Sequence, residues 1–182
     1  MKDSKFEKVL LDEGTIRARV IELGLQLTRD YAGKTPTLIC VLRGASSFFA
    51  DLSREIELPI FEDFIAISSY GDKTSTSGEV KLVKDVAEGI EGKDVVLVED
   101  IVDSGNSMKY IKELFAARKP ASIKVCAFLD KPSRRTVDFQ ADYVGFTVPD
   151  EFLVGYGLDY GQRFRNLKDV RVLAAEVYGG KK

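Results

Sequence analysis

DVVLVEDIVDSGNS, residues 94–107, joins an apolar run to two acids and then to a turn of small polar residues. The apolar part, residues 95–98, is continuous rather than alternating, which is typical of a parallel strand covered by helices on both faces. After Ser107, apolar residues recur every three or four positions, which indicates an amphipathic helix that begins near Ser107. The stretch therefore predicts a central strand, a turn and a helix.

The turn between that strand and that helix has the features of an anion site. Residues 103–107 would offer backbone N–H groups and two hydroxyls at a helix N-terminus, and Gly105 lets the main chain approach a ligand closely. These features suit a phosphate group.

Glu99 and Asp100 do not fit a plain phosphate site, because carboxylates repel phosphate. Carboxylates do accept hydrogen bonds from vicinal hydroxyls and bind hard cations such as Mg²⁺. The stretch therefore predicts a site for a ribose phosphate with a metal nearby. The alternative is a strand end with solvated acids ahead of a helix cap, which the spacing fits less well.

The length and net charge of the chain limit the number of domains and the kinds of partner that it can have. Its 182 residues fit a single domain, residues 1–182, that is long enough to bury a core. With 27 basic and 29 acidic residues the net charge is −2, so no broad basic surface for nucleic acid or an anionic membrane is expected. No apolar run reaches the length of a signal peptide or a membrane span, so we expect a cytoplasmic protein with small-molecule partners.

The residues available for catalysis are restricted. The chain contains no histidine, which excludes His-based triads and His-ligated zinc. Cys40 and Cys126 lie in apolar strand-like runs, where a thiol behaves as a small hydrophobic group rather than as a disulfide partner or nucleophile. Acid–base chemistry therefore falls to Asp, Glu, Lys or Tyr.

A second strand–turn–helix unit precedes the first. Residues 13–31 read as a surface helix, residues 37–42 as a buried strand, and residues 48–52 as helical, with Arg43 and Gly44 in the turn between the last two. Because the carboxyl ends of parallel strands share one edge, Arg43 and Gly44 are expected beside residues 99–107. An arginine next to a glycine-opened backbone suits pyrophosphate, although an exposed arginine in a turn is the alternative.

Residues 70–78, YGDKTSTSG, are polar, small and without packing periodicity. Strands predicted at 64–69 and 80–84 flank this segment closely, which favours a mobile lid over simple disorder.

Further strands are predicted at residues 122–129, 143–148 and 152–156, with an apolar tail at 170–177 that docks on the body. Strands that alternate with helices indicate a parallel α/β sheet. The sequence has no GxxxxGK[ST], and the glycines of GYGLDYG do not match GxGxxG, so NTPase and dinucleotide-binding functions are disfavoured.

Five segments occur in the order found in one family: LICVLRGASSFFADL, SSYGD, VLVEDIVDSGNS, FLDKPSRR and VPDEFLVGYGLDYGQRFRNL. The chain resembles the type I phosphoribosyltransferases, particularly the 6-oxopurine (hypoxanthine-guanine) branch, over nearly its whole length. The resemblance implies a twisted parallel sheet flanked by helices, with a small hood built from the chain ends. It also implies a homodimer or homotetramer that transfers phosphoribose from 5-phosphoribosyl 1-pyrophosphate (PRPP) to hypoxanthine or guanine with Mg²⁺.

The same resemblance implies a role for each matching residue. The ribose and 5′-phosphate would be bound by Glu99, Asp100, Asp103, Ser104, Gly105, Asn106 and Ser107, and pyrophosphate by Arg43, Gly44 and Arg165. The purine would meet Lys131 at its 6-oxo group, the ring of Phe152, the main chain of Leu153, and Asp159, while Asp103 would act as the catalytic group at N7. The metal would lie near Glu99, Asp100 and Asp159, and Ser69 and Tyr70 would begin the lid.

Each of these roles has a simpler alternative. Lys131 could be a solvated loop residue, Phe152 a core residue and Asp159 a turn former. The chain also departs from the family pattern at Ser104 and Ser107, where threonine is frequent, and at Gly157, which replaces a common alanine. The choice of base, including xanthine, stays open, as does a non-catalytic PRPP-binding regulator, which would need a basic face and lack the base-stacking segment.

Overall fold

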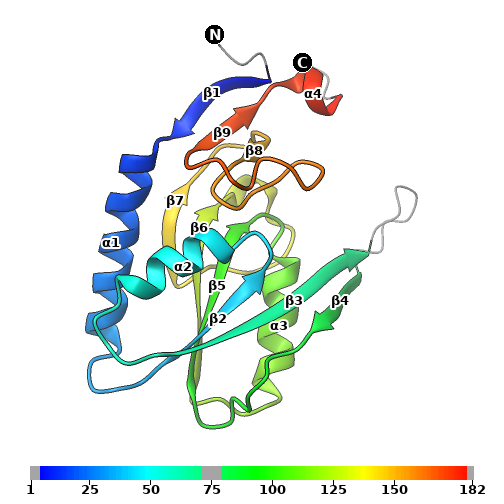
Figure 1. Ribbon diagram of the computed structural model, residues 1–182. Coiled ribbons are helices and arrows are strands. Elements are labelled where there is room, and N and C mark those ends of the chain that lie inside the picture. Colours follow the sequence, from blue (N-terminus) through cyan, green and yellow to red (C-terminus); the bar gives the residue numbers. More distant parts are fainter. Residues whose placement is uncertain (1–4, 71–78, 180–182) are drawn as a thin grey trace.

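The computed structural model describes residues 5–70 and 79–179, and its largest element is a six-stranded sheet in the order β4-β3-β2-β5-β6-β7 (Figure 1). The strands are β2 (Thr37–Leu42), β3 (Phe61–Tyr70), β4 (Glu79–Lys84), β5 (Asp94–Val102), β6 (Ser122–Asp130) and β7 (Tyr143–Thr147). All neighbouring pairs are parallel except β3 and β4. The predicted α/β class with a mainly parallel sheet is confirmed.

β5 lies inside the sheet, between β2 and β6. The side chains of Val95, Val96, Leu97 and Val98 are fully buried, as expected for a strand that is covered on both faces. In the register of the sheet Val98 pairs with Cys40, and Glu99 pairs with Ala127. Glu99 therefore directly follows the last residue of β5 that pairs with β2 and is still paired with β6.

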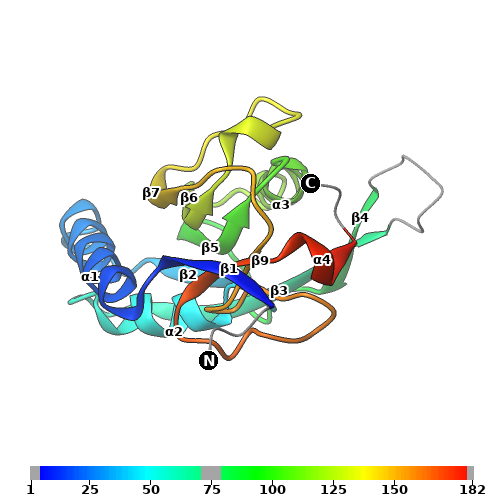
Figure 2. The same cartoon turned by 90° about the horizontal axis from the view of Figure 1, so that it is seen from above.

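Helices cover both faces of this sheet (Figure 2). α1 (Glu13–Asp30) and α2 (Ser46–Arg54) pack on one face, and α3 (Asn106–Ala116) packs on the other. The Asp12 side chain caps α1 by accepting a hydrogen bond from the Thr15 backbone N–H at 2.8 Å. The helices predicted from the apolar periodicity are all present.

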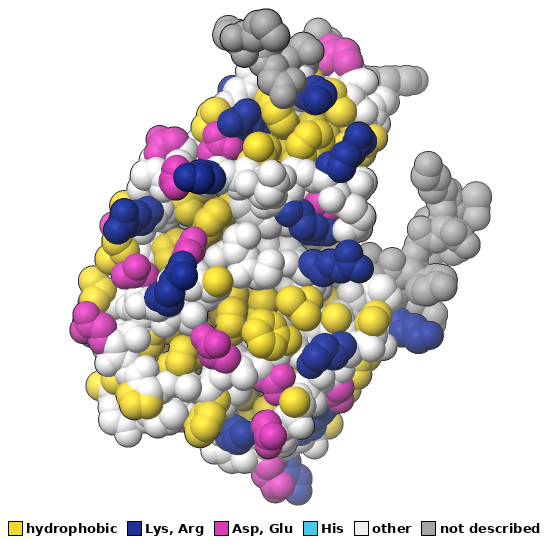
Figure 3. Space-filling model, viewed as in Figure 1, with side chains coloured by type: hydrophobic (Ala, Val, Ile, Leu, Met, Phe, Trp, Pro, Cys, Tyr) yellow, Lys and Arg dark blue, Asp and Glu magenta, His cyan; other side chains and the backbone are white. Residues whose placement is uncertain are grey.

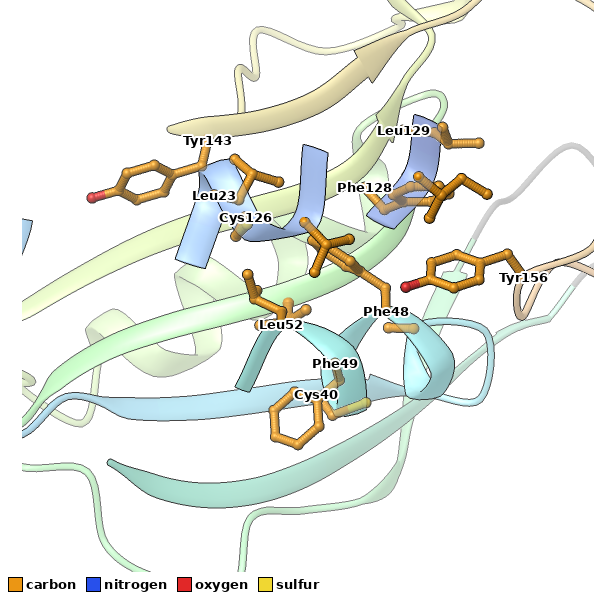
Figure 4. Packing of buried hydrophobic residues seen from close by; sticks show 14 of the residues in the cluster. Leu23, Cys40, Phe48, Phe49, Leu52, Cys126, Phe128, Leu129, Tyr143 and Tyr156 are labelled. Atoms are coloured by element: carbon orange, nitrogen blue, oxygen red, sulfur yellow. The ribbon is translucent and has the colours of Figure 1, made fainter. Parts of the chain in front are cut away.

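The core on the α1/α2 face extends beyond the large sheet. Phe128 of β6 packs against Phe48 of α2 and against Tyr156, with ring centroids 5.3 and 4.9 Å apart (Figure 4). Cys40 and Cys126 are buried and free, and burial raises the pKa of each thiol to about 12. Such thiols are protonated at neutral pH, which agrees with the predicted packing role.

A second, three-stranded antiparallel sheet in the order β1-β9-β8 forms the hood. It consists of β1 (Phe6–Leu11), β9 (Val170–Leu173) and the short β8 (Leu153–Val154), and α4 (Ala175–Tyr178) follows β9. The strand predicted at 152–156 is reduced to two residues. β1 was not predicted, because two register shifts break its alternation and leave three successive residues exposed.

β4 runs antiparallel to β3, as fits the prediction of a strand that returns from the loop before it. A parallel return needs a crossover of about a dozen residues or more, and the connection 71–78 is shorter than that. The predicted lid at 70–78 lies almost wholly outside the described residues and stays a prediction; Ser69 and Tyr70 form the end of β3.

The surface of the molecule carries mixed charge. On the face drawn in Figure 3, basic and acidic side chains are interspersed, which fits the small net charge. In the part of the chain that the structure describes, no helix combines the length and apolarity that a bilayer span requires.

Candidate active site

Two adjoining cavities lie at the carboxyl ends of the central strands. The first, of about 290 Å³, is lined by residues that follow β2, by β5 and its turn, and by Asp159 and Arg165. The second, of about 520 Å³, is lined by Lys131, by residues 150–153 and by Tyr178. Both are lined by Asp100, Ile101, Asp103 and Asp159, so these residues separate two compartments of one site.

The turn after β5 forms one wall of the first cavity. Gly105 caps α3 with a φ of +88°, a conformation that favours glycine, and Ser104 and Ser107 line the cavity on either side of it. Asn106 lies apart from both linings, because its side-chain amide donates to the Thr136 hydroxyl at 3.4 Å. The turn therefore offers two hydroxyls and a helix N-terminus to a ligand, as expected.

Arg135 braces this turn from a segment about thirty residues further along the chain. Its Nη1 donates to the main-chain carbonyls of Asp103 at 2.5 Å and Val102 at 3.2 Å, and its Nη2 contacts Asp130. A side chain at position 105 would meet the Arg135 stem at 3.0 Å, so the glycine also allows this packing. Arg135 lies within the FLDKPSRR motif, but nothing in its local sequence indicates this brace.

Glu99 and Asp100 occupy different environments although they are adjacent. Glu99 is buried, and its Oε1 accepts a hydrogen bond from the Asp100 backbone N–H at 3.0 Å. Burial, and then the neighbouring charge of Asp100, raise the pKa of Glu99 well above its usual value. Asp100 faces Gly44, where an added Cβ would lie 1.5 Å from Asp100 Oδ2. Position 44 therefore requires glycine for this approach.

Arg43 and Arg165 meet at Gln162. Gln162 Oε1 accepts from Arg43 Nη1 at 3.2 Å and from Arg165 Nη2 at 3.4 Å. Arg165 also pairs with Asp159 at 2.5 Å and donates to the Gly157 carbonyl at 2.7 Å. Two cations far apart in the sequence thus lie at one end of the first cavity. Gln162, which joins them, was not among the predicted site residues.

Lys131 is buried at the second cavity, so the interpretation as a solvated loop residue is wrong. Its Nζ donates to the Glu151 carbonyl at 2.9 Å and lies 3.7 Å from Asp150 Oδ1. These contacts tie the end of β6 to the segment before β8.

Phe152 is 37% exposed and therefore is not a core residue. Its ring stacks on Tyr178 with centroids 4.9 Å apart and meets Tyr160 edge-on at 5.6 Å. Leu153 follows in β8 and lines the same cavity. Asp159 does form a turn contact, since its Oδ2 accepts from the Gln162 N–H at 2.8 Å, but it also faces both compartments. Tyr178 was missed because its segment carries no recognisable motif.

The contact between Gly157 and Gly44 leads to a testable prediction. Gly157 has a φ of +102°, and an added Cβ would lie 2.0 Å from the Gly44 carbonyl oxygen. Because alanine is common at this position in the family, the surrounding backbone can adjust, and we expect Gly157→Ala to shift the Gly44 loop and raise the KM for PRPP, at a cost of about 1–3 kcal/mol of stability. Thermal unfolding and initial rates measure the two effects.

Gly161→Ala is a control for that prediction, because Gly161 has open space around its Cβ position and its φ of +58° lies in the left-handed region that other residues can adopt. Equal effects of the two substitutions would assign the loss to backbone conformation alone and would contradict the predicted collision with Gly44.

The fold and the cavities at the carboxyl edge of its sheet are typical of α/β enzymes, which bind their ligands at that edge. A family model described as "Phosphoribosyl transferase domain" matches residues 8–161. A hypoxanthine-guanine phosphoribosyltransferase of Streptococcus thermophilus is 48% identical over 98% of this chain and 99% of its own length. The corresponding protein of Bacillus subtilis is 49% identical over the same shares.

Solved structures agree with the sequence comparison. A hypoxanthine phosphoribosyltransferase from Staphylococcus aureus superposes with a TM-score of 0.92 at 44% identity, covering 96% of this chain and 95% of that one. The chain belongs to the hypoxanthine-guanine phosphoribosyltransferases of the phosphoribosyltransferase family, which are pentosyl-transferring enzymes.

Proposed function

We propose that this protein converts hypoxanthine or guanine, with PRPP, to IMP or GMP and pyrophosphate, as a purine-salvage transferase. The observation that supports this most directly is the position of Asp103, which faces both compartments. Its Oδ1 is shielded from solvent and accepts no hydrogen bond from the described residues. Arg134 Nε lies 3.0 Å from this oxygen as an ion-pair partner, whereas the Asp103 side chain as a whole is 43% exposed. The other carboxylate oxygen would therefore be the one that accepts the N7–H of a purine.

The reaction displaces pyrophosphate at the anomeric carbon of ribose. Glycosyl transfer passes through an oxocarbenium-like state, so charge that develops on the leaving group must be neutralised. Arg43 and Arg165, held together by Gln162, would bind the pyrophosphate. The turn at 103–107 would hold the 5′-phosphate, with Ser104, Ser107 and the α3 N-terminus as donors.

The purine would occupy the second compartment. Phe152 presents an exposed ring on which a base can stack, and the Leu153 main chain lies beside it. The buried ammonium of Lys131 would donate to the 6-oxo group, whereas a 6-amino purine offers it no acceptor there. Asp103 would accept the N7 proton as the new glycosidic bond forms.

Mg²⁺ fits the oxygen ligands of this site as a cation shared with substrate. Within residues 5–70 and 79–179, no group of three or more His, Cys, Asp or Glu side chains is placed to hold a metal by itself. Mg²⁺ is commonly bound through one or two carboxylates together with substrate phosphates and water. Glu99, Asp100 and Asp159 would supply the carboxylates, and the ion would neutralise charge on pyrophosphate.

Removal of the metal should therefore stop turnover. With excess EDTA we expect nucleotide formation to be lost and to return when Mg²⁺ is added back. Calorimetry should show tight Mg²⁺ binding only when PRPP is present. Full activity in EDTA would contradict the proposed requirement.

The test of the proposed function is a steady-state assay with PRPP, Mg²⁺ and hypoxanthine, guanine, xanthine or adenine. Formation of IMP and GMP, with little product from adenine, is expected. Product from xanthine alone would identify a transferase for another base. PRPP binding without product from any base would indicate a non-catalytic regulator.

We further propose one domain, residues 1–182, that is cytoplasmic and assembles as a homodimer or homotetramer. A single domain is supported by the shared core, in which Leu153 and Val172 of the hood join residues of α1 and the large sheet. One cooperative unfolding transition and a light-scattering mass of two or four chains are expected.

A further inference from the structure

Arg134 lies at the second compartment, outside the set of residues that the family resemblance singles out. Its Nε is 3.0 Å from Asp103 Oδ1, and its Nη1 donates to Asp150 Oδ1 at 3.4 Å. One guanidinium therefore joins the turn after β5 to the segment that leads into Phe152. It forms part of the lining of the cavity in which the purine is proposed to bind.

The backbone around Arg134 fixes its position against that turn. The short 3-10 helix η1 (Pro132–Arg134) is closed by the Arg134 N–H donating to the Lys131 carbonyl at 3.2 Å. The Thr136 N–H donates to the Ser104 carbonyl at 3.0 Å. Three successive residues therefore contact the turn. Arg135 and Thr136 donate hydrogen bonds to its main-chain carbonyls, and Arg134 pairs with the Asp103 carboxylate.

The contact of Arg134 with Asp103 is an ion pair without a directed hydrogen bond. Oδ1 has no hydrogen-bond partner among the described residues, although the guanidinium lies within 3.0 Å. The cation therefore holds the shielded Oδ1 in place, and the part of the carboxylate that stays exposed is left to accept from a ligand. An arginine stays protonated, so it does not compete for the purine proton.

Stability does not account for this arrangement. The side chains of Arg134 and Asp150 are each 53% exposed and that of Asp103 is 43% exposed. Exposed ion pairs of this kind contribute little to folding. The other charged groups that line the compartment are Asp100, Lys131, Glu151 and Asp159.

We propose that Arg134 is a positioning residue that holds the Asp103 carboxylate toward the purine and couples it to the base-stacking segment. This inference rests on the proposed function. Displacing a reacting group by about 1 Å can cost about a hundredfold in rate. Loss of the Arg134–Asp103 contact should therefore lower kcat. Phosphate binding by the turn does not depend on this side chain.

The test measures kcat, the KM for PRPP and the thermal midpoint for Arg134→Ala and Arg134→Lys, each with and without Asp103→Asn. For Arg134→Ala we expect kcat to fall by about tenfold or more, with the KM for PRPP within about threefold and the midpoint nearly unchanged. Arg134→Lys should recover part of the rate, because the lysine ammonium restores the positive charge but not the planar set of N–H donors of the guanidinium. Arg29→Ala, an exposed arginine at the end of α1, is the control and should match the parent enzyme.

The double substitution decides the mechanism. If Arg134 acts through Asp103, Arg134→Ala should have less than about a twofold further effect once Asp103→Asn is present. The same fold-loss in both backgrounds, or a wild-type kcat for Arg134→Ala, would overturn the proposal. Failure of the unmodified enzyme to make nucleotide from any oxopurine would instead refute the proposed function, so the two failures are distinguishable.

Discussion

Asp103→Asn is expected to lower kcat by about 10²–10⁴-fold, the range for loss of a general acid–base group, while the KM for PRPP changes little. The asparagine keeps the shape of the side chain, and the main chain of residue 103 stays held by Arg135 at 2.5 Å. The turn at residues 103–107 should therefore keep its conformation. What is lost is the carboxylate that is proposed to accept the N7 proton.

Steady-state kinetics with hypoxanthine, together with thermal unfolding, checks this expectation. A purely structural Asp103 predicts the opposite pattern, in which stability falls and turnover stays near normal in the protein that remains folded. An unchanged kcat would remove Asp103 from the mechanism.

Lys131→Gln is expected to reduce the preference for hypoxanthine over adenine, measured as the ratio of kcat/KM, by at least about tenfold. A site built to hydrogen-bond one substrate group can reject an analogue lacking that group by about 10⁴–10⁵-fold, so a large part of the discrimination can depend on one donor. Glutamine can still donate to the Glu151 carbonyl that Lys131 contacts at 2.9 Å. The fold should therefore tolerate the change.

The control for Lys131 is an ammonium outside the site. Lys124 pairs with Asp142 at 2.8 Å on the outer part of β6, and Lys124→Gln should leave the base preference unchanged. A wild-type ratio in Lys131→Gln would mean that the buried ammonium serves only to hold residues 150 and 151.

The sequence predicted the parts of the molecule whose signals are local. β2 and β5 appear as continuous apolar runs because both faces are buried, and residues 99–107 combine acids, hydroxyls and a glycine in one contiguous segment. The position of Arg43 and Gly44 beside residues 99–107 was predicted because the carboxyl ends of parallel strands share one edge of the sheet. Each of these inferences needed only a short window of sequence and one rule of topology.

The parts that were missed depend on contacts between distant segments. β1 is half exposed and bulged, and its partner β9 lies near the other end of the chain. Gln162, Tyr178 and Arg134 contribute to the site only because the hood and the segment after β6 are brought to the same edge. The apolar periodicity of the sequence carries no information about such contacts between distant segments. The sequence alone therefore could not place these three residues at the site.

The hood has a consequence for the order in which the protein becomes competent. β1 can form its sheet only with β9, and their pairing Phe6↔Leu173 joins nearly the first and last described residues. Closing so long a loop is entropically costly and slow relative to local contacts. During synthesis the turn at 103–107, which is proposed to bind phosphate, is made before β9, which pairs with β8 beside the proposed purine compartment. We therefore expect the proposed base site to form only after residues 170–173 have been made and have paired with β8.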